Sequence, residues 1–133
     1  MSNQKENNMV FVFGSNLRGV HGAGAARVAR EKHGAIMGRG EGIMGNSYAI
    51  PTKDRSIRHM LPLSEIQEAV DRFIHYATNH PHKSFQVTQI GCGLAGGRAE
   101  DIAPMFRAAP DNCLFDEAWR RWLPTKQFWG SVR

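Results

Sequence analysis

The feature that most constrains this chain is a pattern that occurs twice: a short apolar strand, a glycine-rich loop and a helix-forming segment. Residues 9–13 form the first predicted strand, and the loop after it spans residues 14–22. Residues 85–90 form a later strand, which runs into a second loop over residues 91–97. Short β-forming segments that alternate with helices are typical of an α/β fold with a largely parallel sheet.

The segments around these two units continue the alternation. Ser64 and Gln67 have the spacing of a capping box, which predicts that a helix begins at Ser64. One face of this helix is apolar, formed by Ile66, Val70, Phe73, Ile74 and Ala77. We also predict helices over 23–33 and 100–109, one or two helical turns over 116–122, strands over 48–51 and 113–115, and a glycine-rich connection over 34–46. The expected architecture is a three-layer α/β fold with a mostly parallel sheet and helices on both faces.

Length and composition are those of one domain. The chain has 133 residues, of which 41% are hydrophobic, so we expect a single domain over 9–133 after a flexible tail over 1–8. The apolar runs are far shorter than the roughly 20 residues that a membrane helix needs. We therefore expect a cytoplasmic protein with no membrane partner. Cys92 and Cys113 match neither a redox pair nor a zinc site, so we expect no disulfide, metal or cofactor.

The charge balance favours an anionic ligand. Seventeen Lys and Arg residues oppose twelve Asp and Glu residues, which gives a formal net charge of +5. Net charge governs long-range attraction and does not identify the anion. A nucleic acid and a small phosphorylated molecule therefore both remain candidate ligands at this point.

The two glycine-rich loops are the candidate anion site. In an open parallel sheet, ligands bind beyond the carboxyl ends of the strands, where helix N-termini present unpaired backbone N–H groups. We predict that the first loop binds through Gly14, Ser15, Asn16, Gly22, Ala23 and Gly24, and the second through Gly91, Cys92, Gly93, Leu94, Ala95 and Gly96. The alternative is that the glycines only permit tight turns. Neither loop has the Walker or the dinucleotide-binding pattern.

Three side chains near these loops are candidates for chemistry. His21 lies among the glycines of the first loop, where an imidazole can contact a phosphate or relay a proton, or can brace the loop by a hydrogen bond. Lys53 and Asp54 follow the 48–51 strand at the same sheet edge. We predict that Lys53 binds phosphate and that Asp54 binds a ribose or acts as a base, the alternative being a solvated turn. Cys92 has no paired base, which favours a packed thiol.

A family resemblance adds to this interpretation. The segments Phe13-Gly-Ser-Asn16, His21-Gly-Ala-Gly-Ala-Ala26 and Gly91-Cys-Gly-Leu-Ala-Gly96 resemble a group of small uncharacterised bacterial and bacteriophage proteins over most of residues 9–112. That group is similar to macro domains, which hold the diphosphate of ADP-ribose between two such loops. The resemblance implies a nucleotide ligand such as ADP-ribose, and in some macro domains hydrolysis of an ADP-ribosyl bond.

The chain differs from macro domains at two places. Macro domains usually carry an early acidic residue that binds adenine, whereas Glu6 is the single acid before the first strand here. Hydrolytic macro domains place an Asp just after the glycine cluster, where this chain has Ala25 and Ala26.

The C-terminal segment suggests a second class of function. Residues 119–129 interleave Trp and Phe with Arg and Lys, which is typical of a surface that stacks on single-stranded nucleic acid. The same residues are enriched at protein contacts, so self-association is another interpretation. Packing of Trp119 and Trp122 under the sheet is the simplest one. The alternative function is therefore a non-enzymatic basic protein that binds nucleic acid or a protein partner.

Overall fold

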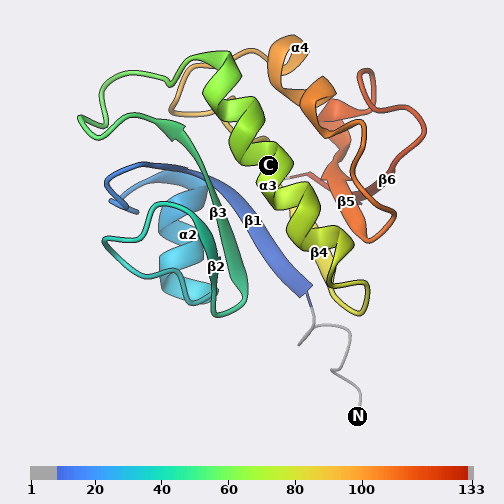
Figure 1. The fold of residues 1–133 in the computed structure, drawn as a ribbon, viewed down its shortest axis with the longest axis horizontal. Coiled ribbons are helices and arrows are strands. Elements are labelled where there is room, and N and C mark those ends of the chain that lie inside the picture. Colours follow the sequence, from blue (N-terminus) through green and yellow to red (C-terminus); the bar gives the residue numbers. More distant parts are fainter. Residues whose placement is uncertain (1–8, 132–133) are drawn as a thin grey trace.

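The computed structural model describes residues 9–131, which form an α/β fold around one six-stranded sheet (Figure 1). The strands are β1 (Met9–Asn16), β2 (Gly42–Met44), β3 (Ser47–Lys53), β4 (Ser84–Val87), β5 (Cys113–Asp116) and β6 (Gln127–Gly130). The α-helices are α2 (Gly24–Lys32), α3 (Leu63–Thr78) and α4 (Ala99–Ile102). The tail expected over 1–8 lies outside the described residues.

The sheet is mostly parallel, as the sequence predicts. Its strand order is β2-β3-β1-β4-β5-β6, so β1 lies between β3 and β4 in the middle of the sheet. Only the pairing of the short edge strand β2 with β3 is antiparallel among the described strands. The carboxyl ends of β1, β3 and β4 therefore meet at one edge, and both glycine-rich loops start there.

Alternate residues of β1 pack on opposite faces of the sheet. Val10 and Val12 belong to the larger hydrophobic core, together with the apolar face of α3. Phe11 and Phe13 belong to a smaller core with Ala26 and Ala29 of α2. Because successive side chains of a strand point to opposite faces, α2 and α3 cover different faces. Figure 1 shows α3 across the front of the sheet and α2 behind it.

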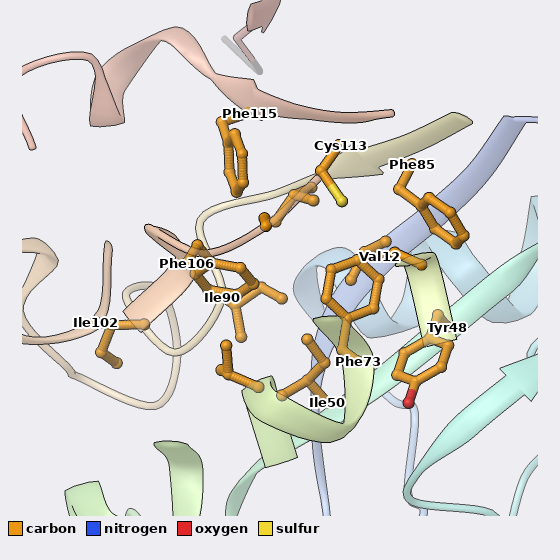
Figure 2. Close-up of a cluster of buried hydrophobic side chains, with 14 of the residues drawn as sticks. Val12, Tyr48, Ile50, Phe73, Phe85, Ile90, Ile102, Phe106, Cys113 and Phe115 are labelled. Atoms are coloured by element: carbon orange, nitrogen blue, oxygen red, sulfur yellow. The ribbon is translucent and has the colours of Figure 1, made fainter. Parts of the chain in front are cut away.

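The larger core is aromatic. Phe73 of α3 is fully buried, and its ring packs edge-on against Tyr48 and Phe85 with centroids 5.1 and 5.4 Å apart. Figure 2 shows these side chains beside Val12 and Ile50. The stripe predicted for this helix is confirmed, since all of its residues except the half-buried Ile74 are fully buried.

Several predicted element boundaries are wrong, each for a local reason. α3 begins at Leu63 after Pro62, so Ser64 lies inside the first turn and forms no capping box. The helix expected over 100–109 is a single turn of α4 followed by a 3₁₀ turn at Ala103–Phe106, because Pro104 has no backbone N–H to continue an α-helix. The one or two helical turns expected over 116–122 are present as a 3₁₀ turn at Glu117–Trp119.

Strand assignments also differ from the prediction. β4 ends at Val87, because the next residues turn and the Ile90 N–H donates to the Thr88 carbonyl over 2.8 Å. β2 lies inside the connection that was expected to be only a loop, and β6 follows the segment predicted to be helical. Both of these short strands lie at the edges of the sheet.

Candidate functional site

A hollow of about 400 Å³ lies at the sheet edge where β1, β3 and β4 end. Both glycine-rich loops line it, and most of the residues predicted to bind a ligand are among its walls. The lining residues are Gly14, Ser15, Asn16, Val20, Gly22, Ala23, Gly24, Ala25, Ala26, Thr52, Lys53, Ile57, Thr88, Gln89, Gly91, Gly93, Leu94 and Ala95. The volume falls within the roughly 300–1,000 Å³ range of small-molecule sites.

The first wall of the hollow is the start of α2. The first α-helical hydrogen bond runs from the Arg27 N–H to the Ala23 carbonyl over 3.3 Å, so the amides of Gly24, Ala25 and Ala26 have no partner within the helix. No side chain caps this end, and the first turn has no acidic residue. The start of α2 thus presents free donors and a partial positive charge to the hollow.

The second wall is the loop after β4. Its shape is set by backbone hydrogen bonds, from Gly96 N–H to Gly93 O over 3.0 Å and from Gly97 N–H to Gly91 O over 2.7 Å. Within residues 9–131, the amides of Gly93, Leu94 and Ala95 have no hydrogen-bond acceptor. This loop therefore adds a second set of free backbone donors to the same hollow.

The two walls approach each other at Gly24 and Leu94. A Cβ built on Gly24 would lie 3.2 Å from the Leu94 Cδ1 atom, and Gly24 has a φ of +60°. Both the space and the backbone conformation therefore favour glycine here. Leu94 itself is 67% exposed, which leaves an apolar side chain at the mouth of the hollow.

Side chains of the first loop brace its backbone. The Asn16 side chain donates to the Val20 carbonyl over 2.8 Å and accepts from the Val20 N–H over 3.0 Å. The Ser15 hydroxyl donates to the Gly40 carbonyl, and the Gly38 N–H donates to the Gly19 carbonyl over 2.8 Å. The connection between α2 and β2 is thus hydrogen-bonded to the first loop and holds its backbone in place.

His21 is part of this bracing and does not line the hollow. Its side chain is fully buried, and its Nε2 atom lies 3.1 Å from the Ile36 carbonyl oxygen and 2.9 Å from the Arg39 carbonyl oxygen. With two acceptors beside it, Nε2 carries the proton and donates. The loop-bracing alternative describes this geometry, and the predicted proton relay or phosphate contact does not.

Lys53 and Asp54, at the end of β3, differ in their position relative to the hollow. Lys53 lines the hollow, as its predicted phosphate contact requires. Asp54 does not line it, and its carboxylate accepts hydrogen bonds from the backbone N–H and the hydroxyl of Ser56. The Ser56 hydroxyl holds the pKa of Asp54 below its usual value. Asp54 therefore fits the turn alternative, because a base or ribose contact needs a carboxylate at the hollow.

The second loop contains no activated nucleophile. Cys92 is half-buried against the larger core, and burial raises the pKa of its thiol to about 11. A thiol with this pKa is almost entirely protonated near neutral pH. Cys92 is therefore a packed side chain beside the hollow, which agrees with the absence of a paired base in the sequence.

The C-terminal aromatic residues pack within the domain. Trp119 is fully buried in the larger core, and the Trp129 indole donates to the Val87 carbonyl over 2.9 Å. The Arg120 guanidinium covers the Phe128 ring at 4.2 Å and is also paired with Glu117. The packing of Trp119 is confirmed. Trp122 and Phe128 also pack against this core, and they and Trp129 remain partly exposed.

Seven lining residues were not among those predicted from the sequence: Val20, Ala25 and Ala26 adjoin the predicted residues of the first loop, and Thr52, Ile57, Thr88 and Gln89 lie elsewhere. Thr52 lies near the end of β3 and Thr88 directly follows β4, on either side of β1, and their hydroxyls donate to the Ser15 and Val12 carbonyls over 3.2 and 2.8 Å. Gln89 follows Thr88, and Ile57 lies in the turn after β3. Thr52, Thr88 and Gln89 lie at the carboxyl ends of the two parallel strands that flank β1, and this position made them predictable from the sequence. Ile57 carried no such signal.

Comparison with protein-family models, curated proteins and solved structures finds no match for this chain. Among the described residues, no helix is long and apolar enough to cross a membrane. Residues 9–131 also contain no cluster of His, Cys, Asp and Glu arranged to hold a metal ion. The site is therefore defined by its own geometry: a hollow in an α/β domain, lined by backbone donors and by Lys53 as its one titratable side chain.

Proposed function

We propose that this protein binds a nucleotide diphosphate such as ADP-ribose, as a macro-like module, with its phosphates held by the two glycine-rich loops. The observation that carries the proposal is that Gly24–Ala26 and Gly93–Ala95, whose backbone amides have no acceptor among the described residues, line one hollow. Two adjacent sets of N–H donors suit the two phosphates of a diphosphate, since anions bind where such donors converge.

The charge of the hollow supports the same class of ligand. Lys53 lines it, and no Asp or Glu is among its lining residues. A phosphate that enters therefore meets donors and a cation without a nearby carboxylate to repel it. The resemblance of both loops to those of macro domains supports ADP-ribose as the first ligand to test.

The lining residues support binding rather than hydrolysis. Proton transfer requires a titratable side chain within hydrogen-bond reach of the reacting group. His21 is buried behind the first loop, Asp54 is held in a turn, and neither lines the hollow. We therefore propose a binding module whose ligand leaves unchanged.

Gly93→Val tests this function directly. Gly93 lines the hollow, and a Cβ there meets no atom within 4 Å, so the fold accommodates a bulky side chain at this part of the lining. We expect wild-type protein to bind ADP-ribose in calorimetry and Gly93→Val to bind it at least 100-fold more weakly, because a side chain there displaces phosphate from the amides.

Ala108→Val is the matched control, since Ala108 is exposed and does not line the hollow. It introduces the same valine side chain elsewhere and should keep wild-type affinity. Circular dichroism checks that both variants are folded. Equal ADP-ribose affinity in folded Gly93→Val and wild type would remove the second loop from the site, and a wild type that binds no nucleotide would remove the proposal itself.

A further inference from the structure

Ile57 combines two properties that rarely occur together. It lines the hollow, and its backbone has a φ of +60°, the only positive φ of a residue other than glycine between residues 9 and 131. The left-handed region is unfavourable for β-branched residues, because the Cβ atom crowds the neighbouring carbonyl oxygen. Glycine or asparagine would occupy this position with less strain.

The turn that contains Ile57 is held firmly in place. Its two ends are joined by backbone hydrogen bonds from Asp54 N–H to His59 O over 2.9 Å and from Leu61 N–H to Thr52 O over 2.8 Å. At the tip, the Asp54 carboxylate accepts from Ser56, and the Ile57 N–H donates to the Asp54 carbonyl over 3.0 Å. Asp54 thus organises the turn that presents Ile57.

Apolar side chains also line the hollow. Ile57 comes from the turn after β3, and the exposed Leu94 comes from the second loop, so two aliphatic side chains from different segments line one space. Aliphatic side chains offer phosphate oxygens no hydrogen bond and no opposite charge. A sugar or base attached to the phosphates gains by burying its carbon-rich face against them.

We infer that Ile57 is a specificity-determining residue that contacts the uncharged part of a bound nucleotide, and that its strained backbone is retained for this contact. The inference rests on the proposed function and deepens it, because it selects a nucleotide over a bare diphosphate. Strained residues persist where the surrounding structure holds them, and they cluster at ligand-binding sites.

The test compares two probes, ADP-ribose and inorganic pyrophosphate, on wild type, Ile57→Gly and Ile57→Val. Ile57→Gly relieves the backbone and deletes the side chain, whereas Ile57→Val keeps both the strain and most of the apolar surface. For Ile57→Gly we expect a higher Tm than wild type, about tenfold weaker binding of ADP-ribose and unchanged binding of pyrophosphate. Ile57→Val should bind both probes as wild type does.

The outcomes separate the inference from the proposed function. If wild type binds neither probe, the proposed function fails. If wild type binds ADP-ribose and Ile57→Gly binds it equally well, the function stands and the role of Ile57 is refuted. An equal loss of affinity for ADP-ribose and pyrophosphate in Ile57→Gly would also refute this role. The turn would then be positioning the phosphate donors.

Discussion

The two glycine-rich loops line the same hollow, yet they are built differently. The first loop is held by side chains, with the Asn16 amide bonded to Val20 and the buried His21 ring bonded to Ile36 and Arg39. The second is held by its own backbone, through bonds such as Gly97 N–H to Gly91 O. The polar side chains of the first loop therefore maintain its shape, and both loops offer the ligand mainly backbone donors.

This comparison explains why the conspicuous side chains were misleading. A histidine among glycines at a helix start has the sequence context of a phosphate contact and of a loop brace alike. What distinguishes them is the position of the 34–40 segment, whose carbonyls surround the ring. That segment is joined to the first loop by the hydrogen bond from Gly38 N–H to the Gly19 carbonyl, a contact that the sequence around His21 does not encode.

The largest effect that tests the contrast between the two loops is the loss of folding stability in His21→Ala. Removing the ring leaves the Arg39 carbonyl without its donor and opens a cavity under the first loop, so we expect a loss of about 3 kcal/mol in the free energy of unfolding. Cys92→Ala, the equivalent truncation in the second loop, should cost about 1 kcal/mol because Cys92 is only half-buried. Urea denaturation measures both.

His82→Ala serves as the control, since His82 is exposed. It should change stability by less than about 0.5 kcal/mol. A His21→Ala protein as stable as wild type would mean that the first loop does not depend on the buried ring, and the contrast between the loops would fail.

A smaller effect concerns pH and the thiol of the second loop. Burial raises the pKa of Cys92 from 9.0 to about 11, so the folded state favours the neutral thiol. Its contribution to stability is complete below pH 9 and is lost as the pH rises through 11, because the unfolded chain ionises first. Burial also raises the pKa of Cys113 and of Tyr48 to about 12, so wild-type stability falls in this range for several reasons.

Cys92→Ala isolates the contribution of the second loop. Its free energy of unfolding, measured in urea at pH 8, 9, 10 and 11, should decline less steeply than that of wild type. Identical slopes in the two proteins would show that Cys92 is not desolvated in the folded state.

The sequence predicted the framework of the site more fully than its details. The central strands and the two loops follow from apolar runs that end at glycines, so the fold class and most lining residues, including Lys53, were predictable. The edge strands β2 and β6 were missed because they are short and lack an apolar run. Ile57 was missed because its role depends on a backbone conformation that isoleucine seldom adopts.

The most direct test of the central claim is an amide-resolved NMR titration of ¹⁵N-labelled protein with ADP-ribose. If backbone donors of both loops hold the phosphates, the largest shifts will occur at the amides of Gly24–Ala26 and of Gly93–Ala95. These are the donors that lack an acceptor within their own segments. No binding, or shifts confined to one loop or to the C-terminal segment over 119–129, would contradict the account.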